Sequence, residues 1–574
     1  MKTYLLSAIL ICMLCQACVK SVPEADLIIF GGNIYTVEMG QPKVEALAVK
    51  NDKILAVGDL KNIEKYKGAK TELLDLKGKT LIPGFVESHA HLLGLGKQQR
   101  QLDLSSVKNY DELLALVAKA AKNTPKGEWI LGRGWHQSKW DPKPQLITGY
   151  QAHEKLSEVS PDNPVMLVHA SGHALFANAE AMKRAGIDPD KKLIGENKVG
   201  GDGEIIRYPN GKPTGIFTEN AMEIIQAQVP EDSKESRYKD LQAAFAECLK
   251  NGITSFQDAG SDAAAIEIYR EALKNGEFPV RLWVMLSYSN YAAEKQEEDD
   301  PFLLEWFKKG KEIGDFLSIG GVKLYADGAL GSRGAWLLED YTDRPGFTGN
   351  VLLPIPVMEK IADNCLKSGF QLCTHAIGDR ANREVLNIYE RSLKKQPEKA
   401  KDHRFRIEHA QHVDPKDIPR FKQLSVIASV QTIHFSSDRP WAIDRLGQMR
   451  IQAGAYRWKQ LIESGAMVIN GTDAPVEPVN PIPCFYAAVS RKTLNGEAFE
   501  TDQKMSREQA LRCYTLDAAY GCFEENKKGS LKVGKFADFT VLSQDIMTVA
   551  EEEILKTKVL MTIVGGKTKL NRTQ

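Results

Sequence analysis

The stretch Leu81-Ile82-Pro83-Gly84-Phe85-Val86-Glu87-Ser88-His89-Ala90-His91 carries the first evidence for the fold. The apolar run at residues 81–86 predicts a buried strand, and His89 and His91 follow it as His-Ala-His. Alternate residues of an extended chain point to the same side, so both imidazoles can reach one metal ion. The stretch therefore predicts a strand that ends at a metal site.

Seven further apolar runs follow along the chain, and helix-length segments such as 240–250 and 356–367 lie between most of them. Eight strands alternating with helices predict an α/β fold of the TIM (β/α)8 barrel type. In such a barrel the chemistry lies at the carboxyl ends of the strands. The seven further predicted strands cover residues 253–257, 281–286, 321–325, 370–374, 405–408, 426–430 and 467–470.

Both ends of the chain carry short β-type runs separated by Gly, Asn and Asp turns. We therefore expect residues 26–80 and 525–570 to pair into one small β-sandwich domain built from both termini. The barrel is expected over 81–520. The gap between its first two strands is too long for one crossover, which predicts an insertion at 95–220 with strands at 128–131 and 165–169.

Four more chemically competent side chains lie on the predicted strands. His375, His409 and Asp473 end three of them, and Lys323 lies within an apolar one. Each alone has an ordinary explanation: a hydrogen-bonded core histidine, a helix N-cap for the aspartate, a structural ion pair for the lysine. Together with the His-Ala-His pair they converge on one barrel mouth, which favours a metal site.

At this point the sequence resembles the amidohydrolase superfamily, specifically its Amidohydro_3 branch with the YtcJ-like proteins. The resemblance implies the barrel, the β-sandwich and hydrolysis at a metal centre, most often of an amide-like, non-peptide C–N bond. The motifs that carry it are residues 83–91, Lys323-Leu324-Tyr325-Ala326-Asp327-Gly328-Ala329-Leu330-Gly331-Ser332-Arg333, Thr374-His375-Ala376-Ile377-Gly378-Asp379, Ile407-Glu408-His409-Ala410-Gln411, Gly471-Thr472-Asp473-Ala474-Pro475-Val476-Glu477-Pro478 and the terminal segment 529–542.

The resemblance also implies roles for the ligands. One divalent ion, with zinc expected, is placed on His89, His91 and Asp473, and a second on His375 and His409. Lys323 bridges the two ions as a CO2-derived carbamate, because a cationic lysine is a poor ligand. A metal ion lowers the pKa of water and so supplies hydroxide at neutral pH, with Asp473 as the proton shuttle. The single-ion alternative keeps His89, His91, His375 and Asp473, and His409 polarises the substrate carbonyl.

The substrate pocket is less defined by the sequence. Several residues are candidates for this pocket, although each could instead have a packing or surface role. His173 lies in a segment that resembles a substrate-proximal segment of the family. The other candidates are Trp135 with His136, His434 after strand seven, and Asp327 and Arg333 after strand four. The last two could bind a polar group of the substrate or pair with each other.

The composition restricts the partners. Lys+Arg and Asp+Glu are both 75, so the formal net charge of the 574 residues is zero and a nucleic-acid role is excluded. A small molecule is the expected substrate. The alternatives are an esterase or lactonase at the same centre and a non-catalytic surface lipoprotein that binds a ligand. The oligomeric state stays open, with a homodimer as one alternative.

The first eighteen residues predict the compartment. Lys2 precedes a short apolar run, and Leu14-Cys15-Gln16-Ala17-Cys18 resembles the lipobox of bacterial lipoproteins, with Cys15 as a departure from its usual aliphatic residue. We expect residues 1–18 to be a lipoprotein signal peptide and Cys18 to be lipidated. The mature protein would then be membrane-anchored in the bacterial cell envelope, on its periplasmic or surface face.

Cys18→Ala is expected to move the protein from the membrane fraction to a soluble or mislocalised form, because the thiol that accepts the lipid is lost. Fractionation of cells with an antibody against the protein measures this. Wild-type protein found in the cytosol would contradict the anchor.

Overall fold

The computed structural model describes residues 22–137, 140–169, 174–193, 198–199, 203–230, 232–289, 300–331 and 333–573. The predicted lipobox cysteine, Cys18, lies outside these ranges, so its lipidation stays a prediction. Within them, no helix combines the length and apolar character needed to cross a bilayer.

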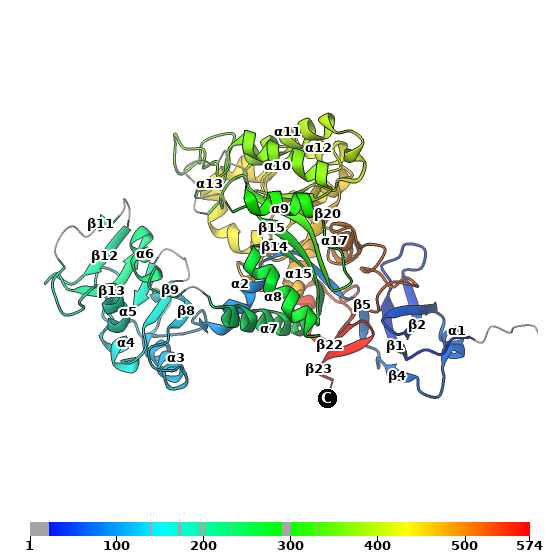
Figure 1. Cartoon of the computed structure of the whole chain (residues 1–574), viewed down its shortest axis with the longest axis horizontal. Helices are drawn as coiled ribbons and strands as arrows, with labels where there is room; N and C mark the ends of the chain where they lie inside the picture. The colour runs from blue at the N-terminus through cyan, green and yellow to red at the C-terminus, as the bar shows by residue number, and fades with distance from the viewer. Residues whose placement is uncertain are drawn as a thin grey trace, which may run out of the picture.

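The centre of the molecule is an eight-stranded parallel barrel sheet (Figure 1). Neighbouring strands pair in parallel register from first to last. Most are buried along their whole length, which explains why they appear in the sequence as apolar runs. The strands, in spatial order, are β6 (Phe85–Ala90), β14 (Ile253–Ser261), β15 (Arg281–Ser287), β16 (Leu317–Tyr325), β17 (Gln371–Ala376), β18 (Arg406–His409), β19 (Ile427–Val430) and β20 (Val468–Asn470).

The chain that follows β20 closes the barrel against β6. The Asp473 amide donates to the His89 carbonyl at 2.7 Å, and the His91 amide donates to the Ala474 carbonyl at 2.7 Å. These two bonds connect the two predicted ligand segments, one from each end of the barrel sequence.

Helices surround the barrel sheet and follow its strands. They are α2 (Leu92–Arg100), α7 (Lys234–Lys250), α8 (Ala263–Lys274), α9 (Pro301–Lys309), α10 (Ile355–Ser368), α11 (Asp379–Lys395), α12 (Ile418–Gln423), α13 (His434–Gly454), α14 (Trp458–Glu463), α15 (Pro481–Ser490), α16 (Arg507–Cys513) and α17 (Leu516–Tyr520). Short 3-10 turns lie at Glu64–Tyr66, Glu219–Met222, Lys399–Asp402, Thr501–Gln503 and Glu551–Lys556.

The first predicted strand, at 81–86, is wrong in its extent. Residues Thr80–Pro83 form β5 of a different sheet, and β6 begins only at Phe85. Gly84 separates them at a close approach, where a Cβ would lie 2.1 Å from the Thr254 hydroxyl oxygen. His89 therefore lies inside β6 rather than after it, because the apolar run continues through two strands of separate sheets.

Both ends of the chain meet in one terminal sheet. β5 pairs antiparallel with β21 (Phe539–Leu542), which joins the N-terminal strands to the C-terminal ones. In the described residues, strand pairing makes this a single sheet and does not divide it into the two facing sheets of a sandwich. Its other strands are β1 (Leu27–Tyr35), β2 (Lys43–Lys50), β3 (Lys53–Gly58), β4 (Glu72–Asp75), β22 (Val559–Val564) and β23 (Lys567–Asn571), with α1 (Leu60–Ile63) beside them.

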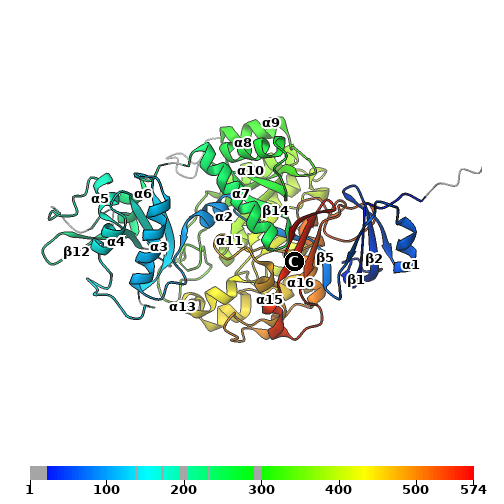
Figure 2. The ribbon, with the colours of Figure 1, turned by 90° about the horizontal axis from the view of Figure 1, so that it is seen from below.

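The insertion between β6 and β14 is a separate unit with its own seven-stranded sheet, on the opposite side of the barrel from β1 and β2 (Figures 1 and 2). Residues 95–100, predicted as part of it, instead complete α2, whose Gly96 packs directly against the Asp240 backbone of α7. The elements are β7 (Leu102–Asp103), α3 (Tyr110–Asn123), β8 (Ile130–Trp135), α4 (Glu154–Val159), β9 (Val165–His169), β10 (Ala174–Ala177), α5 (Ala179–Arg184), β11 (Lys198–Val199), β12 (Gly203–Arg207), β13 (Pro213–Thr218) and α6 (Glu223–Gln226).

Candidate metal centre

The predicted metal ligands meet at the carboxyl ends of the barrel strands. Asp473 Oδ1 lies 3.5 Å from His89 Nε2 and 3.3 Å from His91 Nε2. These three residues can offer ligand atoms that all lie within 4.8 Å of one another. Two imidazoles and one carboxylate at this spacing are donors that suit a divalent cation.

The other two histidines extend this group across the barrel mouth. The ring centroids of His89 and His409 are 4.8 Å apart, and those of His409 and His375 are 4.4 Å apart. The sequence prediction that strands one, five, six and eight bring these side chains together is thus matched by their positions.

The buried ligands have free donor atoms. His375 is only 8% exposed, and neither of its ring nitrogens has a hydrogen-bond partner among the described residues; Nε2 lies 3.5 Å from Asp327 Oδ1. Asp473 Oδ1 is also buried without a hydrogen-bond partner in that part of the chain. Buried polar atoms normally have partners, so this group of orphaned atoms fits a cation bound between them.

The protonation states suit ligation. Burial, followed by the nearby Lys323 charge, lowers the pKa of His375 to about 3, which leaves the imidazole neutral with a free lone pair. Burial alone would raise the pKa of Asp473, but the neighbouring His89 and His91 imidazoles hold it well below its usual range. The aspartate is therefore an anion at neutral pH.

Neighbouring acceptors orient two of the imidazoles. His409 Nδ1 donates to the Gln431 side-chain carbonyl at 2.7 Å, and His89 Nδ1 donates to the Glu408 carboxylate. These contacts leave Nε2 of each ring as the atom that faces the other predicted ligands and that a metal ion would bind. This is the arrangement in which a second residue fixes the tautomer of a metal ligand.

Glu408 and Arg406 are functional residues that the sequence reasoning did not single out. Arg406 Nε lies 2.7 Å from Glu408 Oε1, and both side chains are fully buried. Burial would raise the pKa of Glu408, but Arg406 and then His89 hold it well below its ordinary value. The signal in the sequence was the run Arg406-Ile407-Glu408-His409, which places two charges at period two in a buried strand, directly before a predicted ligand.

Glu408→Gln is expected to weaken divalent metal binding by roughly 10–100-fold, the usual cost of losing a residue that supports a metal-bound histidine. The neutral amide no longer increases the basicity of His89. Titration of metal-free protein against a competing chelator measures the affinity, with Glu390→Gln as the control because that carboxylate pairs with Lys394 on the outside of α11. Unchanged affinity in Glu408→Gln would show that Glu408 has only a structural role.

Glu87 holds the two ligand segments together from behind. Its carboxylate accepts from the His89 amide at 3.0 Å and from the Thr472 amide at 2.9 Å. Gly471 is required beside it, because a Cβ there would lie 2.3 Å from Glu87 Oε1. The carboxylate therefore fixes the spacing between His89 in β6 and the loop that carries Asp473.

Lys323 lies in β16 under the histidines. It is 1% exposed, and its Nζ lies 3.3 Å from His89 Nε2. In the described residues no carboxylate lies within ion-pair distance of it, so the structural ion pair considered as an alternative is absent. Burial lowers the pKa of the amine, which favours its neutral form.

Asp327 and Arg333 do not form a substrate site together. Asp327 is fully buried and accepts from the amides of Trp336, Ile377 and Gly378 at 2.8–3.0 Å, which holds the loop after His375. Arg333 instead forms an ion pair with Asp343 at 2.8 Å. The proposed pairing of Asp327 with Arg333 is therefore wrong, and the aspartate is a positioning residue.

The other residues predicted to line the substrate pocket lie in different places. Trp135 is fully buried, donates to the Leu167 carbonyl and belongs to the core of the insertion, so its assignment to the pocket wall is wrong. His434 stacks on His409 with ring centroids 6.1 Å apart, which places it next to the metal centre. His173 lies outside the described residues, and its role stays a prediction.

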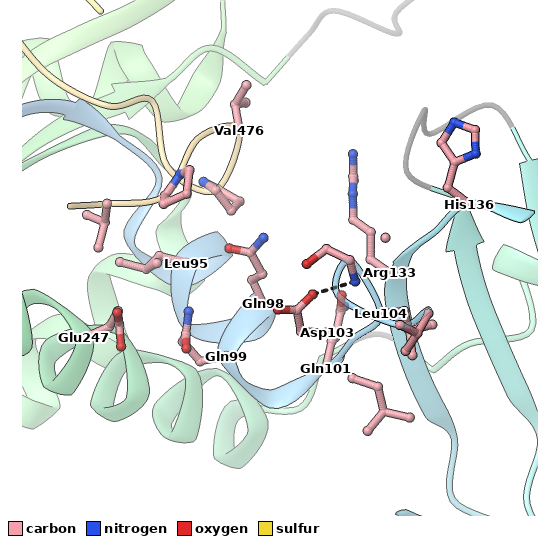
Figure 3. A pocket seen from close by; sticks show the side chains of 17 residues that line it. Leu95, Gln98, Gln99, Gln101, Asp103, Leu104, Arg133, His136, Glu247 and Val476 are labelled. Atoms are coloured by element: carbon pink, nitrogen blue, oxygen red, sulfur yellow. Dashed lines mark hydrogen bonds between the residues drawn. The ribbon is translucent and has the colours of Figure 1, made fainter. Parts of the chain in front are cut away.

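A cleft of about 520 Å³ runs beside the metal centre, between the barrel and the insertion (Figure 3). Its lining includes Pro475 and Val476, which follow Asp473, and Leu95 of α2, whose amide bonds to the His91 carbonyl. His136 lines it from the insertion, in agreement with the prediction that this residue faces a pocket.

Comparisons with known proteins place these residues in a family context. The sequence matches the model of the Amidohydrolase family over residues 72–569, which include the whole candidate metal centre. It is 31% identical to the putative amidohydrolase YtcJ of Bacillus subtilis, over 94% of this chain and 98% of that protein. It is 27% identical to an N-substituted formamide deformylase of Arthrobacter pascens, over 96% and 99% of the two chains.

A solved structure has the same fold as this chain. The crystal structure of an uncharacterized metal-dependent hydrolase from Pyrococcus furiosus covers 91% of this chain and 100% of its own, with a TM-score of 0.72 and 28% sequence identity. The shared fold extends over barrel, insertion and terminal sheet alike, because nearly all of both chains is superposed.

Proposed function

The chain belongs to the amidohydrolase family of metal-dependent hydrolases, and from this premise we propose that it cleaves an amide-like, non-peptide C–N bond of a small molecule. The observation that carries the proposal is the group of buried, partnerless donor atoms on His375 and Asp473 beside His89, His91 and His409. A donor set of imidazoles and one carboxylate suits zinc.

His89, His91 and Asp473 would hold one ion, and His375 and His409 would hold a second. A divalent cation in this place supplies Lewis acidity, which polarises a substrate carbonyl and lowers the pKa of water. We include a carboxylated Lys323 between the two positions, because its neutral amine is the form that reacts with CO2. The single-ion arrangement, in which His409 polarises the carbonyl, is the alternative. It requires a proton on His409 Nε2 in addition to the one that Nδ1 donates to Gln431, and the lowered pKa of His409 disfavours that doubly protonated form.

Asp473 is the proton carrier in this proposal. Its carboxylate is ionised, lies at the barrel mouth and has an oxygen without a hydrogen-bond partner in the described residues. It accepts a proton from water as the water attacks the carbonyl carbon, and it delivers that proton to the leaving nitrogen. Protonation of the nitrogen lets it leave as a neutral amine.

A C–N bond is favoured over an ester by the relative that is named as a formamide deformylase. The experiment is turnover of matched N-formyl, N-acetyl, ester and lactone compounds by purified zinc-loaded protein. We expect kcat/KM to be highest for the N-acyl compounds. Faster hydrolysis of the esters at every matched structure would replace the amide proposal with the esterase alternative, and turnover of none would contradict both.

A further inference from the structure

The cleft beside the metal centre has two chemically different walls (Figure 3). On the barrel side, the loop that follows Asp473 lines the cleft with Pro475 and Val476, and the helices α2 and α7 add Leu95 together with the polar side chains Gln98, Gln99 and Glu247. Val476 is 66% exposed, so its side chain is accessible to a ligand in the cleft. This wall offers a surface for the hydrocarbon part of a substrate.

The insertion wall carries a free cation. Arg133 lies on β8, is exposed and, in the part of the chain that the structure describes, is the only lysine or arginine that lines the cleft. In Figure 3 its side chain extends into the gap between the insertion and the Val476 loop. Within the described part of the chain its guanidinium has no hydrogen bond or ion pair, so all its N–H donors are available.

Neither acidic residue of the cleft forms an ion pair with this arginine. Asp103, the strand neighbour of Arg133, accepts from the Ser105 amide at 2.9 Å. Glu247, on the barrel side, pairs with Lys250 at 3.0 Å and accepts from Asn251. Both carboxylates have partners, and neither lies within ion-pair distance of the guanidinium.

We propose that this cleft is a substrate subsite for an aliphatic or aromatic stem that ends in a carboxylate, with the stem on Val476 and the carboxylate on Arg133. A guanidinium is the side chain best suited to bind a carboxylate through two parallel hydrogen bonds. The inference rests on the proposed function, since the metal centre takes the scissile bond at the other end of the molecule. Its substrate class is an N-acyl compound with an anionic tail.

The test is equilibrium binding of inhibitors that need no turnover. Hydroxamates chelate a divalent ion, so alkyl hydroxamates with two to six methylenes can be compared by calorimetry with their ω-carboxy and ω-amino analogues on zinc-loaded protein. We expect the ω-carboxy compound of the best-fitting length to bind about tenfold or more tightly than its alkyl match, the usual gain from a hydrogen-bonded charge pair.

Variants assign that gain to the arginine. Arg133→Gln should abolish it, and Arg133→Lys should keep part of it, because a lysine retains the charge without the planar fork. Lys155→Gln is the matched control: it removes a positive charge from α4 of the insertion, at a side chain that is 65% exposed and outside the cleft. It should leave the gain unchanged.

Three results would overturn the inference: equal affinity of carboxylated and plain hydroxamates at every length, tighter binding of the amino series, or a carboxylate preference that survives in Arg133→Gln. Failure of the proposed function looks different. In that case the matched panel shows faster ester hydrolysis or no turnover of any compound, whatever the order of the hydroxamate affinities.

Discussion

Asp473→Asn is expected to lower kcat by roughly 10²–10⁴, the usual contribution of a positioned general acid–base group. The amide has nearly the shape of the carboxylate but cannot accept a proton from water or return one to the leaving nitrogen. Steady-state turnover of the best N-acyl substrate measures the effect. Metal content is determined on the same samples, because the residue is also a proposed ligand.

Two controls separate the loss of proton transfer from the loss of metal and from the loss of any carboxylate in this loop. Glu477→Gln removes a carboxylate from the same loop, where it accepts from the Ser437 hydroxyl, and it should leave kcat within about twofold, as for surface changes in general. Asp473→Asn is assayed again after reloading with excess zinc. Wild-type turnover by that metal-loaded variant would rule out the proton-carrier role.

Lys323→Ala should lose one equivalent of metal and most of the activity, with partial rescue by short carboxylic acids that replace the bridging group. The reason is the burial of the amine. Its neutral nitrogen bonds to the carbon of CO2 and releases one proton, and the product is a carbamate anion with two oxygens to donate. Metal analysis measures the loss of metal, and turnover measures both the loss of activity and its rescue. NMR of protein labelled with ¹³CO2 detects the carbamate itself.

A second buried lysine provides the comparison. Lys528 is 3% exposed but pairs with Glu524, and despite its burial the glutamate raises the pKa of the amine, so it stays cationic and unreactive. No carbamate signal is therefore expected from Lys528. An unmodified Lys323 beside a single ion in a high-resolution map of the metal-loaded protein would decide for the single-ion arrangement.

Much of the barrel could be predicted because its strands are buried on both faces. Runs such as 253–257 and 370–374 then appear as apolar segments, and a histidine or aspartate directly after one is conspicuous. The exception was 81–86, where two strands of different sheets adjoin and only the close approach at Gly84 separates them. The apolar pattern of residues 81–86 is the same whether the run forms one strand or two strands of different sheets, so the pattern does not predict the change.

The residues around the ligands were harder to predict, because their roles depend on contacts between distant segments. Glu408 supports His89 from a strand 319 positions away, and Asp327 holds the loop after β17 rather than a substrate. Trp135 lies beside His136 in the sequence, but its ring points into the insertion core while the histidine lines the cleft. Such directions follow from the fold and not from the sequence pattern.

The most direct test of the account is hydrolysis of the best N-acyl substrate before chelation, after chelation and after readdition of zinc. We expect one to two equivalents of divalent metal in the active protein, loss of turnover when they are removed, and recovery when zinc returns. Full turnover by protein shown to be metal-free would contradict it.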